Sequence, residues 1–163
     1  MSVYVVIGSP HDQEYAKECT TLLREFGIAY RLFVASAHRS PEKIDQIIQE
    51  MEKENVQVVI AMAGFAAHLP GILASKTLCP VIGVPLDSSS LLGLDALFSI
   101  VQMPAGIPCA GVGIGKSGAR NAALLAVEIV SLTDPALKER LRIYREEQRL
   151  ALERASQDIE RQE

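Results

Sequence analysis

The chain has 163 residues, which fits a single domain, and 48% of them are apolar, enough to bury a sizeable core. Its formal net charge of −4 argues against nucleic acid or an anionic membrane as a partner, because either would favour a basic footprint. No apolar run approaches the ~20 residues of a membrane span, and nothing resembles a signal peptide, so we expect a soluble, cytoplasmic protein.

Apolar segments typical of buried strands alternate with helical patterns along the first 133 residues. Strands are predicted at 3–7, 29–35, 56–62, 80–84 and 108–114. Helices are predicted at 12–26, from Ser40-Pro41 through Met51, and at 69–77, 91–100 and 118–132. Because strand and helix alternate five times, we expect a three-layer, doubly wound α/β sandwich around a mainly five-stranded parallel sheet.

Small and polar residues mark the ends of these helices. Asp12 and Ser40 stand where an N-cap side chain would accept a hydrogen bond from the first helical turn, and Pro41 suits that turn because its missing N–H costs nothing there. Gly27 follows the first helix and is predicted to end it.

The last part of the chain, residues 134–163, has the pattern of a heavily charged helix. Only Leu137, Leu141, Tyr144 and Leu150 are scattered through it as larger apolar positions, so this helix buries little surface alone. We expect residues 1–133 to form the α/β domain. Residues 134–163 then form an extension that packs on this domain or on a neighbouring subunit.

All three histidines of the chain follow a predicted strand. They lie in the turns Gly8-Ser9-Pro10-His11-Asp12, Ser36-Ala37-His38-Arg39 and Gly64-Phe65-Ala66-Ala67-His68. In an open parallel sheet, ligands bind outside the carboxyl ends of the strands, at the point where strand order reverses. The three turns therefore predict one binding site at one rim of the domain.

Other residues of these turns supply donors for an anion. Arg39 carries a rigid fork of N–H donors that suits phosphate, and the small turns at Ser9 and Ser36 expose backbone N–H groups at helix N-termini. Asp12 has two interpretations that stay open: it caps its helix, or it accepts hydrogen bonds from sugar hydroxyls. The turns predict a site for a phosphorylated small molecule.

The stretch 110–118 loosely matches two nucleotide-binding motifs. Residues 110–117 end in Gly115-Lys116-Ser117, as in a relaxed Walker A loop, and residues 113–118 fit GxGxxG. Either motif needs a later strand that carries the magnesium-binding or ribose-binding acid, whereas only one helix and the charged segment follow. The glycines instead favour close packing of a strand and a helix, or close approach of the backbone to a ligand.

The histidines and cysteines show no metal-ligand spacing. HxH and HExxH patterns are absent, and Asp12 is the only acidic residue of the histidine-containing turns. Cys19, Cys79 and Cys109 lie far apart in no CxxC arrangement, which is typical of buried hydrophobic side chains in a reducing compartment. We expect neither a metal nor another cofactor.

Six motifs in order resemble a known family. They are Gly8-Ser9-x-x-Asp12, Ser36-Ala37-His38-Arg39-x-Pro41, Ala66-Ala67-His68-Leu69-Pro70-Gly71, Pro80-Val81-Ile82-Gly83-Val84-Pro85, Ser99-Ile100-Val101-Gln102-Met103-Pro104-x-Gly106-Ile107-Pro108 and Asn121-Ala122-Ala123. They cover about residues 3–132, and several are long and unusual. The chain resembles the catalytic subunit of phosphoribosylaminoimidazole carboxylase in its class I, N5-carboxyaminoimidazole ribonucleotide mutase form.

The resemblance implies a flavodoxin-like fold and a homo-octameric enzyme of purine biosynthesis that needs neither ATP nor a metal. Such an enzyme moves a carboxylate from the exocyclic nitrogen of an aminoimidazole ribonucleotide to a ring carbon. In that family the residue matching His38 shuttles a proton between the carboxylate and the ring carbon. The residues matching Ser9, Asp12, Ser36 and Arg39 hold the phosphate and ribose, and the turn matching 64–69 closes on the imidazole.

The resulting site prediction names two catalytic residues, His38 and His68. The predicted substrate-binding residues are Gly8, Ser9, His11, Asp12, Ser36, Arg39, Gly64, Phe65, Ala66, Ala67 and Leu69.

Two of these residues depart from the family pattern. His11 stands where the family usually has a serine, and Phe65 stands where it usually has a second glycine. An imidazole is larger than a hydroxyl and its charge depends on pH, so His11 either binds phosphate, better when protonated, or crowds it. Phe65 is costly if its position needs a positive φ or a close backbone approach.

These departures keep alternatives open. One is a variant enzyme that only decarboxylates its substrate or that acts on a related ribonucleotide. The carbon-dioxide-using carboxylase of the same superfamily is disfavoured, because it lacks the run Ala67-His68-Leu69-Pro70-Gly71 found here. An alternative of another class is a non-catalytic flavodoxin-like module that binds a phosphorylated small molecule.

Overall fold

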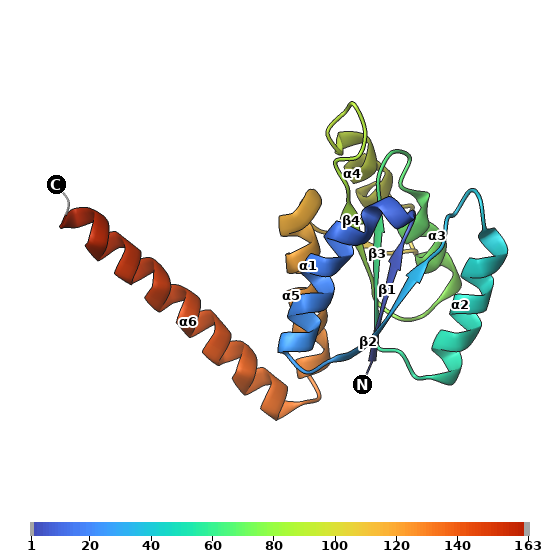
Figure 1. Ribbon diagram of the computed structural model, residues 1–163. Coiled ribbons are helices and arrows are strands. Elements are labelled where there is room, and N and C mark those ends of the chain that lie inside the picture. The colour runs from blue at the N-terminus through green and yellow to red at the C-terminus, as the bar shows by residue number, and fades with distance from the viewer. Residues whose placement is uncertain (1, 162–163) are drawn as a thin grey trace.

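The computed structural model describes residues 2–161, in which a five-stranded parallel sheet carries helices on both faces (Figure 1). Its strands are β1 Ser2–Ile7, β2 Ala29–Val34, β3 Val58–Ala63, β4 Val81–Pro85 and β5 Ala110–Gly111. Its helices are the 3₁₀ turn η1 Pro10–Asp12, then α1 Gln13–Glu25, α2 Pro41–Lys53, α3 His68–Lys76, α4 Leu94–Val101, α5 Gly115–Ser131 and α6 Pro135–Glu160. The predicted doubly wound α/β sandwich is confirmed.

The strand order β2-β1-β3-β4-β5 places the reversal of winding between β1 and β3. From β1 the chain moves outward to β2, and then crosses back to build β3, β4 and β5 on the other side. The end of β1 is tied to both neighbours, because Gly8 N donates to Met62 O at 3.1 Å and Ala35 N donates to Ile7 O at 2.9 Å. The carboxyl ends of β1 and β3 therefore frame the crevice where open α/β sheets bind ligands.

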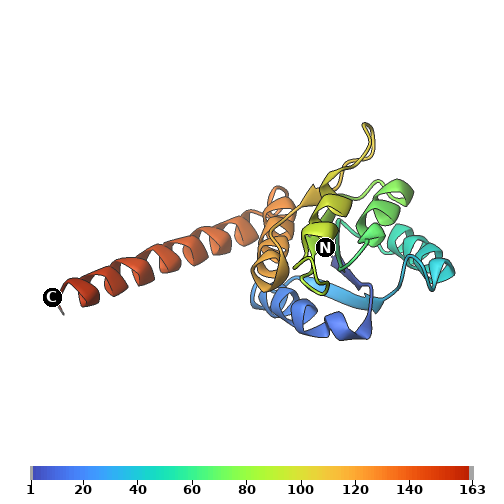
Figure 2. The same ribbon diagram turned by 90° about the horizontal axis from the view of Figure 1, so that it is seen from above.

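Alternate residues of the central strands face two separate apolar layers. Val3, Val5 and Ile7 of β1 join the cluster formed with α1, α5 and the start of α6. Tyr4 and Val6 point the other way, into the cluster formed with α2, α3 and α4. Figure 2, seen from above, shows α1 and α5 on one face of the sheet and α2 and α3 on the other. Burial on both faces explains why these strands read as continuous apolar runs.

Glycine ends the first helix as predicted, but the two expected side-chain caps are wrong. Gly27 has a φ of +64°, and its N–H donates to Arg24 O at 2.9 Å. Asp12 precedes α1 with φ −85° and ψ 3°, a nearly helical backbone set by η1, and its carboxylate makes no capping bond to the described residues. The Ser40 hydroxyl accepts from Ser36 N at 2.9 Å and so shapes the β2–α2 turn instead.

Three elements differ by three or more residues from one of their predicted bounds. The fifth strand is only Ala110–Gly111 instead of 108–114, because it lies at the sheet edge and pairs with just Ile82 and Gly83. Helix α4 begins at Leu94 instead of 91, after a turn with positive φ at residues 92 and 93. Helix α5 begins at Gly115 instead of 118, and so takes in the residues of the relaxed nucleotide motif.

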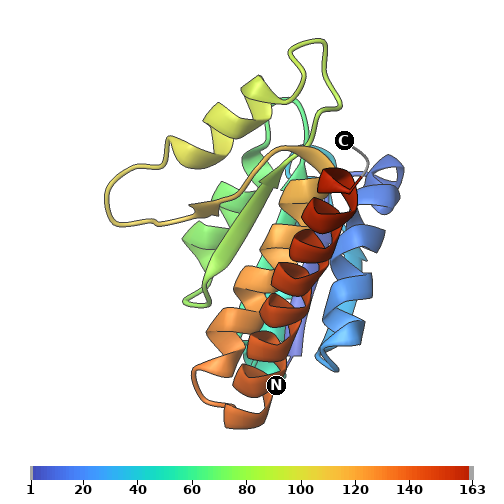
Figure 3. The ribbon, with the colours of Figure 1, turned by 90° about the vertical axis from the view of Figure 1, so that its left-hand side faces the viewer.

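The C-terminal segment is one 26-residue helix, α6, anchored only at its start. Leu137 and Leu141 are buried in the α1–α5 cluster, and Tyr144 packs edge-on against Phe26 with ring centroids 5.3 Å apart. Figures 1 and 3 show α6 starting beside the end of α5, and Figure 1 shows its later turns leading away from the domain. Within residues 2–161, no helix combines the length and the apolar character needed to cross a membrane.

Candidate active site

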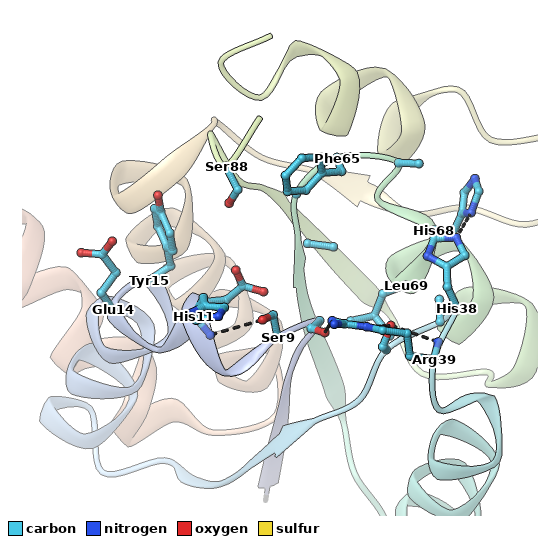
Figure 4. A pocket seen from close by; sticks show the side chains of 17 residues that line it. Ser9, His11, Glu14, Tyr15, His38, Arg39, Phe65, His68, Leu69 and Ser88 are labelled. Carbon is cyan, nitrogen blue, oxygen red and sulfur yellow. Dashed lines mark hydrogen bonds between the residues drawn. The ribbon is translucent and has the colours of Figure 1, made fainter. Parts of the chain in front are cut away.

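A cavity of about 740 Å³ opens at the carboxyl ends of the strands, framed by the turns after β1, β2, β3 and β4 (Figure 4). Its volume falls within the range of small-molecule sites. Twelve of the thirteen residues predicted for the site line it: Gly8, Ser9, His11, Asp12, Ser36, His38, Arg39, Gly64, Phe65, Ala66, His68 and Leu69. All three histidines thus line one pocket, as their positions after three parallel strands predicted.

His38 and His68 form a direct pair on one side of the pocket. His38 Nε2 and His68 Nδ1 are 2.7 Å apart, and the two rings meet edge-on at an interplanar angle of 65° (Figure 4). One hydrogen fits between the two facing nitrogens, so one ring donates and the other accepts.

Arg39 holds its guanidinium across the floor of the pocket. Its Nη2 donates to Gly8 O at 3.3 Å, and its Nε and backbone N donate to the Ser36 hydroxyl at 3.4 and 3.2 Å. These long contacts from an exposed side chain leave the guanidinium donors free to turn toward a ligand. The β2–α2 turn thereby brings a phosphate-binding group to the end of β1.

The turn at the start of α1 faces Arg39 from the other side. The Ser9 hydroxyl accepts from His11 N at 3.3 Å and caps η1. His11 itself is exposed in the pocket, on the opposite side from the His38–His68 pair (Figure 4). Ser9, His11 and Arg39 therefore make one end of the pocket a cluster of donors suited to an anion.

Asp12 is a buried acid in this pocket, with only 7% of its surface exposed. Burial raises the pKa of its carboxyl above the ordinary value, and the Ser9 backbone and the charges of His11 and Arg39 oppose that rise. A carboxylate that lines a cavity but does not cap its helix is available to hydroxyl groups of a ligand. This geometry favours the second of the two interpretations of Asp12.

The turn after β3 is tightly wound against the β4–α4 loop. A Cβ on Gly64 would lie 2.9 Å from both Cβ and Oγ of Ser88, so this position excludes a side chain. The next residue, Phe65, has a φ of +54°, the left-handed conformation that costs a non-glycine residue ~1 kcal/mol. Ala67 N then donates to Phe65 O at 2.9 Å and His68 N to Ala66 O at 2.7 Å, which brings His68 to the pocket.

Ala67 is the predicted site residue that does not reach the pocket. It is buried in the α2–α3–α4 cluster, where its φ of −68° and ψ of 65° complete an inverse γ-turn. Ala67 contributes to the site indirectly, because the turn at this residue directs His68 toward the pocket.

Five lining residues were not among those predicted: Glu14, Tyr15, Ala37, Ala63 and Ser88. Tyr15 Oη donates to Asp87 Oδ1 at 2.7 Å, and this bond, with burial, raises the pKa of Tyr15 to about 12. Ser88 follows β4, so its place at the carboxyl end of a parallel strand predicts that it lines the pocket, as for the residues after β1, β2 and β3. The place of Tyr15 in the sequence, one helical turn beyond His11, likewise puts it near the pocket.

Glycines 113 and 118 meet backbone to backbone beside this region. A Cβ on Gly118 would lie 1.6 Å from Gly113 O, so the GxGxxG match reflects close packing of the helix on the preceding turn. Lys116 forms an exposed ion pair with Glu14 at 2.9 Å. Among the described residues, no three His, Cys, Asp or Glu side chains gather as a metal site would require.

The chain is similar to proteins of one family in both sequence and structure. The sequence profile described as AIR carboxylase matches residues 2–151. The chain is 51% identical over 145 residues to the N5-carboxyaminoimidazole ribonucleotide mutase of Pyrococcus abyssi, which covers 89% of this chain and 82% of that protein. It is 45% identical over 146 residues to the N5-carboxyaminoimidazole ribonucleotide mutase of Escherichia coli K12, and the match covers 90% of this chain and 86% of that protein. The crystal structure of Treponema denticola PurE superposes with a TM-score of 0.85 at 30% identity, covering 93% of each chain.

Proposed function

The chain belongs to the AIR carboxylase family, and from this membership and the pocket we propose that it interconverts N5-carboxyaminoimidazole ribonucleotide and 4-carboxyaminoimidazole ribonucleotide. It is an isomerase of purine biosynthesis. The observation that carries the proposal is the division of the pocket. A donor cluster around Arg39 suits a phosphate, and a hydrogen-bonded histidine pair on another side suits proton transfer.

The phosphate binds at Ser9, His11, Ser36 and Arg39. Arg39 supplies charged, directional donors, and the small turns let backbone N–H groups approach the phosphate oxygens. Asp12 accepts hydrogen bonds from the ribose hydroxyls, because its carboxylate is buried, lines the pocket and does not cap its own helix. This end of the pocket fixes where the imidazole ring lies.

His38 carries the proton. Breaking the bond between the exocyclic nitrogen and the carboxylate releases carbon dioxide and leaves a nitrogen that needs a proton. When the ring carbon attacks that carbon dioxide, a new carbon–carbon bond forms and the ring carbon must lose a proton. One histidine that first donates a proton to the nitrogen and afterwards accepts the proton from the ring carbon balances both steps. His68 supports this role through its hydrogen bond to His38, with the two ring nitrogens 2.7 Å apart.

The reaction is tested by offering each carboxylated ribonucleotide separately to the purified protein. We expect each to convert into the other, with ring-carboxylated product appearing faster than free carbon dioxide is lost. Loss of carbon dioxide without the isomer would establish a decarboxylase instead. Binding of the ribonucleotide with neither outcome would establish the non-catalytic module.

The proton-shuttle role is tested with His38→Asn, which keeps a hydrogen-bonding side chain but cannot take up a proton near neutral pH. Turnover is expected to fall by at least about a hundredfold, while ribonucleotide binding survives. His68→Asn is the matched comparison, because it removes the partner but leaves the His38 imidazole in place, so its loss should be smaller. Full activity in His38→Asn would refute the assignment.

We also propose that the protein is a homo-octamer in which the outer part of α6, from Leu150 onward, packs on a neighbouring subunit. Leu150, Leu152 and Ile159 are exposed along α6, beyond the point where it leaves its own domain. Burying them against another copy would remove apolar surface from water. Light scattering on the full chain and on a chain ending at residue 147, which keeps the buried Leu137 and Leu141, tests this: the full chain should give eight copies and the shortened chain fewer.

A further inference from the structure

Phe65 adopts a backbone conformation that disfavours its residue type. Among residues 2–161, the non-glycine residues with positive φ are Asn55, Phe65 and Leu92. Asparagine tolerates this region better than most residues, whereas a phenylalanine there is strained and a glycine is not. A substitution to glycine would relieve the strain at Phe65 with no change in the course of the chain.

Packing within the described chain does not compensate for that strain. Phe65 is 61% exposed and belongs to neither of the two apolar clusters formed by the described chain. Its neighbour Gly64 lies so close to Ser88 that the turn has little room to shift. The backbone of this turn is therefore restrained, and the exposed ring contributes little to the stability of the domain.

The exposed ring faces the pocket. Phe65 lines the cavity, and Figure 4 shows its ring at the upper wall between Ser88 and His68, with Ser9 and Arg39 lower down. Leu69, a second large apolar residue of the lining, is only 2% exposed. Phe65 thus presents an aromatic face at the upper wall, between Ser88 and the histidine pair and away from Ser9 and Arg39.

We propose that Phe65 determines specificity by stacking its ring on the planar imidazole of the bound ribonucleotide. This inference rests on the proposed function, which places the phosphate at Arg39 and the heterocycle near His38 and His68. An aromatic side chain stacks favourably on a planar heterocycle, and such contacts strengthen binding without any hydrogen bond. Strained backbone conformations cluster at ligand-binding sites, so a strained, exposed aromatic residue at a pocket wall points to a role in binding rather than in folding.

The test compares two ligands that share a phosphoribosyl part. 5-Aminoimidazole ribonucleotide carries the ring, and ribose 5-phosphate does not. Titration calorimetry on Phe65→Gly should show affinity for the ring-bearing ligand reduced about three- to tenfold, with affinity for ribose 5-phosphate within twofold of wild type. Phe65→Leu, which keeps a side chain and the strained backbone but lacks a planar face, should lose most of the same preference.

Leu92→Gly is the matched control, because Leu92 has nearly the same φ, +52°, and is 73% exposed but lies outside the pocket lining. It should leave both affinities unchanged, and both glycine variants should melt no lower than wild type. Equal losses for the two ligands, or full ring preference in Phe65→Leu, would overturn the stacking proposal. A wild-type protein that prefers the ring ligand but does not interconvert the carboxylated ribonucleotides would overturn the proposed function alone.

Discussion

Charged side chains of the pocket and of helix α6 lie in opposite surroundings. Asp12 is buried, and burial raises the pKa of its carboxyl, so its negative charge is held at a cost to the folded state. Arg149 of α6 is exposed and pairs with Glu146 and Glu153, so water and counterions screen its interactions. The charges of the pocket are therefore left for a ligand, whereas those of α6 pair with one another along the helix.

Arg39→Ala is the strongest attempt to break this contrast. We expect affinity for ribose 5-phosphate to fall about ten- to a hundredfold, because a charge-assisted contact to phosphate is lost. The melting temperature should stay within about 2 °C, since the side chain is exposed and its contact with Gly8 O is a long one. Unchanged affinity in calorimetry would remove Arg39 from the anion site.

Asp12→Asn sharpens the contrast through the dependence of stability on pH. Because the pKa of Asp12 is raised on folding, the folded protein holds this proton more tightly than the unfolded chain does. That contribution is present at low pH and is lost as pH rises through the raised pKa, after which the ionised carboxylate destabilises the fold. We expect the variant to be more stable than wild type at pH 7.

Urea unfolding at a series of pH values checks this, and the stability gained by Asp12→Asn should shrink as the pH falls toward 4. Weaker binding of the ribonucleotide should accompany the gain in stability. A variant less stable than wild type at pH 7 would show that the carboxylate supports the fold.

His11→Ser tests whether the charge of the unexpected histidine reaches the phosphate. An imidazole that binds phosphate does so best when protonated, so wild-type affinity should decline as pH rises from 6 to 8. The phosphate itself also titrates near pH 6, in both proteins alike. The quantity to measure is therefore the ratio of wild-type to variant affinity, which should fall several-fold over this range. A ratio that does not vary with pH would indicate that His11 makes no ionic contact.

Arg149→Ala is expected to have the smallest effect. Its ion pairs with Glu146 and Glu153 lie on the exposed outer part of α6, where such pairs contribute little to stability. The melting temperature should change by no more than about 2 °C, and affinity for ribose 5-phosphate should not change. A larger loss of stability would place Arg149 in an interface, and light scattering would then show a change in assembly.

Much of the fold could be predicted from the order of apolar runs. Continuous runs such as 3–7 and 58–62 are buried on both faces, so their composition alone predicts strands of a parallel sheet. The short fifth strand could not be predicted in this way, because only the tertiary packing limits its pairing to Ile82 and Gly83 of the five-residue β4. The side-chain caps expected at Asp12 and Ser40 were wrong for two reasons that the local pattern does not show. A preceding 3₁₀ turn gives Asp12 a nearly helical backbone, and the Ser40 hydroxyl accepts a hydrogen bond from Ser36 N instead.

The alternation of strands and helices is enough to place His11, His38 and His68 in one pocket, because the carboxyl ends of parallel strands meet at one edge of the sheet. The direct contact of His38 with His68, and the separate position of His11, depend on tertiary packing. So do the positive φ and the exposed ring of Phe65, since the dihedral angles of a turn depend on what packs against it. Here Gly64 must fit against Ser88 of the β4–α4 loop, a contact between segments that no local pattern connects.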